Sequence, residues 1–142
     1  MHIADGAEFV RAATERYDYI LVDGFDKDAR AGALDTLPFY AACRERLSDD
    51  GLFAVNLLGR SRGFQASAGR IAEAFAGRSL VFPSCDSGNT IAFATAGEAV
   101  DVSADELRER AERLKRESGL NLLPTVTRLT QAKALARGRL GI

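Results

Sequence analysis

The pattern of apolar positions predicts four strands in the first part of the chain. Residues 17–22 form a run of mainly apolar residues, which is typical of a strand buried on both faces, and residues 52–58 predict the next strand. Two shorter runs, residues 79–82 and 90–95, flank a turn-rich segment and predict two further strands. Ile3 and Ala4 have the character of the end of one more strand.

Helices are predicted between these strands, at residues 7–16, 34–47 and 63–75. The segment 48–51, Ser-Asp-Asp-Gly, is expected to end the second helix, and Gly77 to end the third. Strands that alternate with helices form parallel sheets with crossover connections, whereas the last two strands follow each other directly. The pattern therefore predicts an α/β domain whose last strand is antiparallel to its neighbours.

The remainder of the chain has a different character. Ser103 and Glu106 have the spacing of a capping box, and Leu107, Ala111 and Leu114 form an apolar stripe on the helix that would follow. A second helix is expected at residues 125–137. We therefore divide the chain into an α/β part, residues 1–97, and a helical appendage, residues 98–142.

Composition narrows the class of protein. The 142 residues are 46% hydrophobic and 27% charged, which suits a globular protein with a substantial core. With 19 basic and 20 acidic residues, no overall positive charge points to a nucleic-acid partner. Cys43 and Cys85 lack the spacing of a metal site or a disulfide framework. Neither a signal sequence nor a membrane span is apparent, so a bacterial cytoplasmic location is expected.

The candidate chemistry lies where the strand at 17–22 ends. Asp23 and Asp26 follow this strand, and ligands of open α/β sheets bind at the carboxyl ends of strands. Two neighbouring carboxylates repel each other, and a bound dication offsets that repulsion, so the pair suits a diamine. The alternative is that both residues are loop acids that cap the next helix or lie in solvent.

Several segments resemble one known family. These are residues 2–10 (HIADGAEFV), 17–26 (YDYILVDGFD) and 47–51 (LSDDG), together with Phe39 and Tyr40. In order and spacing they resemble the spermidine synthase family of polyamine aminopropyltransferases, over roughly residues 2–95. The resemblance implies the back half of a methyltransferase-like Rossmann sheet that lacks its first strands and has helices on both faces. It also implies a sheet in which the four strands, in chain order, lie as first, second, fourth and third.

The family's reaction gives these positions roles. An amine such as putrescine attacks the aminopropyl group of decarboxylated S-adenosylmethionine, which serves as co-substrate; no tightly bound cofactor and no metal are expected. By resemblance, Asp5 would bind the adenine amino group, with Gly6 allowing close approach. Asp23 would orient the amine and take its proton, because an ammonium has no lone pair. Asp26 would hold the diamine cation, and Gly24 and Phe82 complete the predicted binding residues.

The chain also departs from the family. The glycine-rich nucleotide loop, the acid that binds the ribose and the N-terminal β-domain all precede the matching segment in the family. Lys27 stands where the family usually has proline, and Phe82 stands where it has a tyrosine that contacts the amine. Residues 85–87 are an insertion. We therefore expect an incomplete catalytic domain that is inactive alone and accepts putrescine, a related amine or none.

Two other functions stay open. A methyltransferase that uses S-adenosylmethionine could be built on the same fold, and the chain could instead be a non-catalytic subunit or a degenerate homologue. The strand at 17–22 would have a bare apolar edge, which proteins seldom leave in water. The C-terminal helices, a second copy or another polypeptide could cover it, and a homodimer is the leading expectation, with no nucleic-acid or membrane partner.

Overall fold

The computed structural model describes residues 3–24, 31–59, 63–84, 88–132, 135 and 137–142. The chain divides into two compact units, Met1–Glu98 and Ala99–Ile142. In the described residues, the first unit contains a four-stranded sheet with three α-helices, and the second contains two helices with a two-stranded sheet. The chain is therefore a mixed α/β protein, as the alternation of apolar runs predicts.

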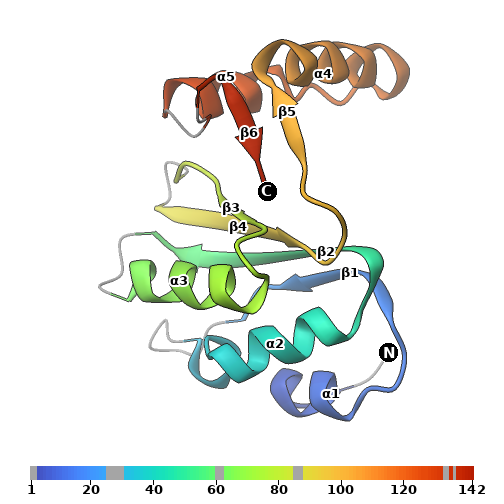
Figure 1. Cartoon of the computed structure of the whole chain (residues 1–142), viewed down its shortest axis with the longest axis vertical. Coiled ribbons are helices and arrows are strands. Elements are labelled where there is room, and N and C mark those ends of the chain that lie inside the picture. Colours follow the sequence, from blue (N-terminus) through green and yellow to red (C-terminus); the bar gives the residue numbers. More distant parts are fainter. Residues whose placement is uncertain (1–2, 25–30, 60–62, 85–87, 133–134, 136) are drawn as a thin grey trace. The chain divides into compact units, whose positions relative to one another are not determined.

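The larger sheet has the strand order β1-β2-β4-β3 (Figure 1). Its strands are β1 (Tyr17–Val22), β2 (Leu47–Leu58), β3 (Ser79–Val81) and β4 (Asn89–Thr95). β1 runs parallel to β2, and β4 lies between β2 and β3 and is antiparallel to both. The predicted order and the predicted reversal of the last strand are confirmed.

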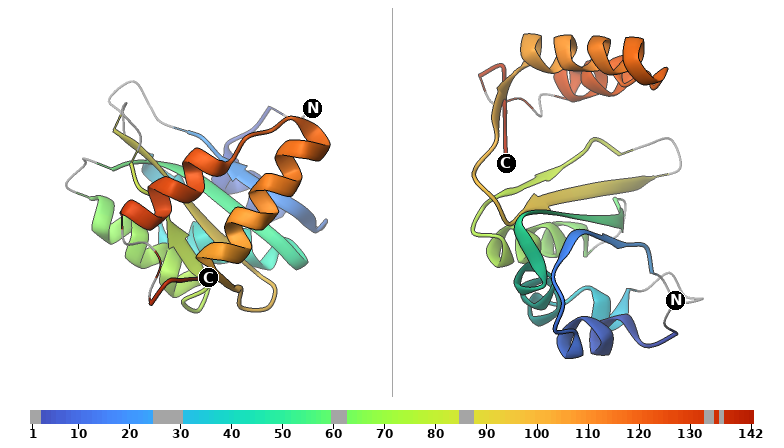
Figure 2. Two further views of the ribbon diagram at one scale, coloured as in Figure 1. Left: turned by 90° about the horizontal axis from the view of Figure 1, so that it is seen from above. Right: turned by 90° about the vertical axis from the view of Figure 1, so that its right-hand side faces the viewer.

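Three described helices pack against one face of this sheet, as the right-hand view in Figure 2 shows. They are α1 (Gly6–Ala12), α2 (Leu37–Glu45) and α3 (Phe64–Ala74), and a short 3₁₀ helix, η1 (Gly32–Leu34), precedes α2. The Thr36 hydroxyl accepts a hydrogen bond from the Phe39 amide at 3.3 Å and so caps α2. Among the described residues of this unit, the expected helices are found on one face of the sheet only.

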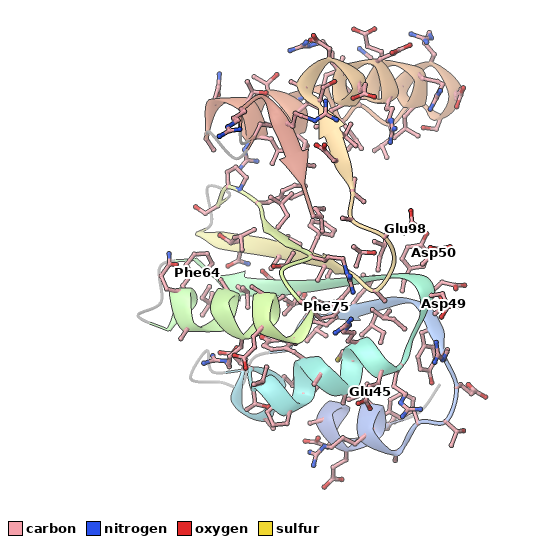
Figure 3. All side chains as sticks on the ribbon, in the orientation of Figure 1. Glu45, Asp49, Asp50, Phe64, Phe75 and Glu98 are labelled. Atoms are coloured by element: carbon pink, nitrogen blue, oxygen red, sulfur yellow. The ribbon has the colours of Figure 1, made fainter. Side chains whose placement is uncertain are left out.

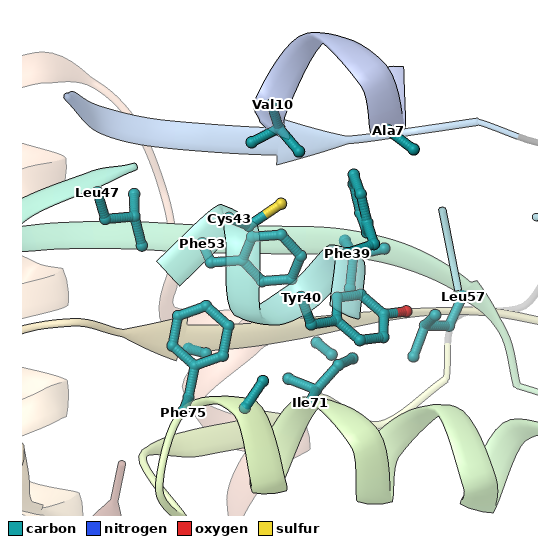
Figure 4. Packing of buried hydrophobic residues seen from close by; sticks show 14 residues of the cluster. Ala7, Val10, Phe39, Tyr40, Cys43, Leu47, Phe53, Leu57, Ile71 and Phe75 are labelled. Carbon is teal, nitrogen blue, oxygen red and sulfur yellow. The ribbon is translucent and has the colours of Figure 1, made fainter. Parts of the chain in front are cut away.

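The core lies between these helices and the sheet (Figure 4). Aromatic rings occupy its centre: the Tyr40 and Phe53 centroids are 5.8 Å apart, and those of Phe53 and Phe75 are 5.3 Å apart. Such separations are typical of favourable aromatic pairs. Phe39 and Tyr40, at 4% and 0% exposure, are packing residues.

The opposite face of the sheet is exposed at its β1 side. Tyr19 and Leu21 alternate with core-facing residues along β1 and are 68% and 76% exposed. The expectation that this strand is buried on both faces is therefore wrong, because the helices of the unit cover only one face. Ile3 is 95% exposed and lies outside any strand, so no strand ends at Ile3 and Ala4.

β2 begins earlier than its apolar run suggests. Residues 48–51 were expected to form the turn after a helix, but they belong to the strand, and Figure 3 shows Asp49 and Asp50 on it. The pairing explains the difference: Tyr17 is opposite Leu47 and Tyr19 is opposite Leu52, so a bulge in β2 takes up the extra residues. The preceding helix accordingly ends at Glu45.

The second unit contains β5 (Asp101–Ser103), α4 (Ala104–Ser118), α5 (Leu123–Gln131) and β6 (Arg139–Gly141). The predicted capping box is confirmed, since Ser103 and Glu106 each accept a backbone hydrogen bond from the other. Gly119 ends α4 with a φ of 78°, the left-handed conformation that favours glycine. The antiparallel pair β5–β6 was not expected, so the appendage is not purely helical. No helix among the described residues is long and apolar enough to cross a membrane.

Candidate functional site

A cleft with a volume of about 370 Å³ runs along β1. Gly6 at the start of α1, Asp23 and Gly24 after β1, and Leu34 of η1 all line it. Its remaining lining is largely apolar and includes the rings of Phe9 and Phe39. The structure thus brings three of the predicted site residues, Gly6, Asp23 and Gly24, to one cleft.

Leu34 joins the two glycines. A Cβ atom added to Gly24 would lie 2.7 Å from Leu34 Cδ1, and one added to Gly6 would lie 3.2 Å from Leu34 Cδ2. Side chains at these positions would therefore crowd the methyl groups of the leucine, which would have to move aside. Leu34 was not identified from the sequence, because its contacts come from residues 10 and 28 positions away.

Asp5 caps α1. Its Oδ1 atom accepts hydrogen bonds from the backbone amides of Ala7 at 2.9 Å and Glu8 at 3.0 Å. Asp5 does not line the cleft, although Gly6 beside it does. The capping contacts give this carboxylate a structural role in addition to the adenine contact predicted for it.

Asp23 is exposed and is held from the neighbouring strand. Asn56 of β2 donates a hydrogen bond from Nδ2 to Asp23 Oδ1 at 3.0 Å. Both residues also line a second cavity of about 370 Å³, together with Asn89 and Ile91 of β4. Asn56 was missed in the sequence, although a polar residue inside the apolar run 52–58 was a usable signal.

Other predicted residues do not join Asp23. Phe82 follows β3 and packs against Phe93, with ring centroids 4.8 Å apart, and it lines neither of the two cavities. Asp26 and Lys27 lie outside the described residues, as does the insertion 85–87. The predicted role of Asp26 in holding the diamine therefore stays a prediction.

A polar network joins the segment before α2 to α3 and was not predicted. Asp35 accepts hydrogen bonds from Tyr40 at 2.8 Å, Ser67 at 2.7 Å and Arg70 at 2.7 Å. Burial acts to raise the pKa of Asp35, but these three donors outweigh it and the pKa is lowered. Burial and the Asp35 carboxylate together raise the pKa of the Tyr40 hydroxyl.

Burial also raises the pKa of the Cys43 thiol to about 12, so this cysteine is a packing residue.

Comparison with known proteins places this arrangement in a family. A sequence model of the spermine/spermidine synthase domain matches residues 1–57. A polyamine aminopropyltransferase of Neisseria meningitidis serogroup A is 36% identical over 118 residues, which are 83% of this chain and 45% of that protein. One of Chromobacterium violaceum is 33% identical over 137 residues, which are 96% of this chain and 52% of that protein. The chain belongs to the spermidine synthase family.

Solved structures of the family agree with the fold. A spermidine synthase in complex with the transition state analogue AdoDATO matches with a TM-score of 0.67 and 28% identity. The match covers 89% of this chain and 46% of that one. The methyltransferase-like fold expected from the sequence is thereby confirmed. This chain spans about half the length of the spermidine synthase relatives that it matches.

Proposed function

We propose that this chain carries the amine-activating part of an aminopropyltransferase site, and that Asp23 is its general base. The supporting observation is the meeting of Gly6, Asp23 and Gly24 at one cleft beside the carboxyl end of β1. A carboxylate at the carboxyl edge of an open α/β sheet lies where ligands of such folds bind. Membership in the spermidine synthase family supplies the class of reaction.

The reaction needs a neutral amine. Putrescine or a related primary amine reaches the site as an ammonium, and Asp23 takes one proton from it. The nitrogen lone pair then forms a bond to the aminopropyl carbon of decarboxylated S-adenosylmethionine. The bond from that carbon to the sulfonium breaks, and its electrons remain on sulfur. The products are the aminopropylated amine and neutral 5′-methylthioadenosine.

The other predicted residues except Phe82 serve binding in this proposal. Gly6 and Gly24 give the nucleoside and the amine access to the backbone, and the free oxygen of Asp5 contacts the adenine. Asp26 holds the second cationic group of the diamine. Phe82 has no binding role in this proposal, because it packs against Phe93 and lines neither cavity. A homodimer and a cytoplasmic location remain predictions of this proposal.

The site is proposed to be incomplete in this chain alone. The relatives are about twice as long as the segment that this chain matches. We expect decarboxylated S-adenosylmethionine and methylthioadenosine to bind weakly or not at all to the chain alone, since Asp5 and an apolar wall would be the main nucleoside contacts. A low-micromolar dissociation constant in a calorimetric titration would contradict this expectation.

Release of methylthioadenosine tests the proposed function. It is measured for the chain alone and for a chimera in which this chain replaces the matched part of the Chromobacterium violaceum relative. We expect no release from the chain alone and turnover by the chimera. In the chimera, Asp23→Asn should lower turnover by about 10²- to 10⁴-fold, the range for a lost general base. Asp18→Asn, at the opposite end of β1, is the matched control.

Three results would contradict the proposal. One is a folded chimera without aminopropyl transfer. Another is near-full transfer by the Asp23→Asn chimera. The third is methyl transfer as the activity observed, which would favour the methyltransferase alternative.

A further inference from the structure

Asn56 is a polar residue in an otherwise apolar strand segment. Its neighbours in β2 are Val55 and Leu57, which are 4% and 5% exposed. Val55 pairs with Val22 of β1, so Asn56 and Asp23 are the next residues along the two parallel strands. The sheet register therefore places an amide beside the carboxylate that ends β1.

The amide has a defined orientation. Its Nδ2 atom donates to Asp23 Oδ1 at 3.0 Å. Its Oδ1 atom is buried and has no hydrogen-bond partner among the described residues. A flipped amide would bring this oxygen against the carboxylate, where two acceptors repel each other. The donor end of Asn56 must therefore face Asp23.

Among the described residues, Asn56 is the one that hydrogen-bonds to the Asp23 side chain. The Asp23 side chain is exposed, and Gly24, which has no side chain to pack beside it, comes next in the chain. An exposed aspartate samples several χ1 rotamers unless a contact selects one. The contact with Asn56 occupies Oδ1, and no residue in the described part of the chain hydrogen-bonds to Oδ2, which can therefore face a ligand in the cleft.

We propose that Asn56 is a positioning residue: its hydrogen bond fixes one rotamer of Asp23 and presents Oδ2 to the acceptor amine. The effect on turnover rests on the proposed function of Asp23, whereas the effect on the rotamer does not. A base must be held close to the productive geometry, since small displacements of a catalytic group are costly.

Nuclear magnetic resonance tests the rotamer directly in the chain itself. Three-bond couplings report χ1 of Asp23 in the wild type, in Asn56→Ala and in Asn56→Leu, whose side chain has a similar size but no donor. We expect one dominant rotamer in the wild type and averaged couplings in both variants. Ser48→Ala is the control, because it removes a 2.7 Å hydrogen bond to Asp18 between the same two strands and should leave Asp23 unchanged.

Averaged couplings in the wild type, or the same single rotamer in a folded Asn56 variant, would overturn the positioning role. Because both variants are compared, a folding failure of one still leaves the measurement decisive. These results hold whether or not the chain supports aminopropyl transfer.

Turnover of the chimera gives the second readout. We expect Asn56→Ala to lower kcat by up to about 100-fold, the cost of a misplaced catalytic group, and to change the KM for the amine less. Asn56→Gln, which keeps the donor, should recover part of the loss. If Asn56→Ala has the kcat of the wild-type chimera, the positioning role is overturned. If no chimera transfers the aminopropyl group while the rotamer responds to Asn56, the proposed function fails and the positioning role stands.

Discussion

The Asp35 carboxylate lies 2.7 Å from a guanidinium nitrogen of Arg70, across 35 residues of sequence. This ion pair joins the segment before α2 to the middle of α3. Ser67 and Tyr40 donate to the same carboxylate, and Tyr40 is completely buried. The network therefore joins α2 and α3 through one carboxylate.

Removing this carboxylate should destabilise the fold. Asp35→Ala leaves the buried Tyr40 hydroxyl without its acceptor and Arg70 without its partner, and we expect a loss of about 2–4 kcal/mol in the free energy of unfolding. Urea denaturation measures the change. Asp49→Ala is the control: Asp49 pairs with Arg16 at 3.0 Å but is 98% exposed, so its loss should change stability by less than about 0.5 kcal/mol. Equal losses of stability in Asp35→Ala and Asp49→Ala would contradict a stabilising role for the Asp35 network.

The Asp35 carboxylate should also make the free energy of unfolding depend on pH in the acid range. In the folded protein the pKa of Asp35 lies below its ordinary value of 3.8, because its three donors outweigh burial. Its contribution to stability is therefore fully present above 3.8 and is lost as the pH falls through the folded-state pKa. We expect the difference in unfolding free energy between wild type and Asp35→Asn to shrink as the pH falls below 3.8. If this difference grew toward low pH, the pKa of Asp35 would be raised by folding rather than lowered, which would contradict the prediction.

Alanine at two glycines should have opposite effects. At Gly24 the new Cβ would lie 2.7 Å from Leu34 Cδ1, so the end of this flexible side chain must shift and stability should fall by about 1 kcal/mol. At Gly69, inside α3, nothing lies within 4 Å of the new Cβ, and alanine should stabilise the protein by about 0.5–1 kcal/mol. Thermal denaturation compares the two variants. A Gly24→Ala variant as stable as the wild type would contradict this prediction, because it would show that the Leu34 side chain moves aside with no loss of stability.

The exposed side of β1 should drive self-association. Tyr19 and Leu21 are large apolar residues on a strand that pairs on one side with β2, and such strands recruit further strands. We expect light scattering to show a dimer at high micromolar concentration. Leu21→Lys should shift the population toward monomer, because a charge on an edge strand opposes pairing. A monodisperse wild-type monomer would contradict this prediction.

Local signals and the family pattern predicted much of the fold. Asp5 and Ser103 precede their helices in ordinary capping sequences, and the apolar runs locate β1, β3 and β4 to within one residue or so. The insertion of β4 between β2 and β3 came from the resemblance to the family, since strand periodicity does not specify neighbours. These features depend on residues close in sequence or on a known topology.

The remaining features depend on contacts between distant residues. The start of β2 at Leu47 follows from pairing with Tyr17, and the β5–β6 pair joins Val102 to Leu140. Leu34 reaches two glycines in separate segments, and Asn56 reaches Asp23 only through the register of two strands. Local propensity contains no information on such pairings, so the supporting residues of the site were missed while its central carboxylate was found.

The strand order also limits when each strand can pair during synthesis of the chain. β2 and β3 each pair with β4 rather than with each other, and β4 ends at Thr95. While the ribosome has released only the residues up to α3, β2 has no partner on one of its edges. The four-stranded sheet can form only after β4 has been synthesised and has paired with β2 and β3, which precede it in the chain. A nascent chain arrested before Asn89 would therefore present an unpaired β2 edge to chaperones.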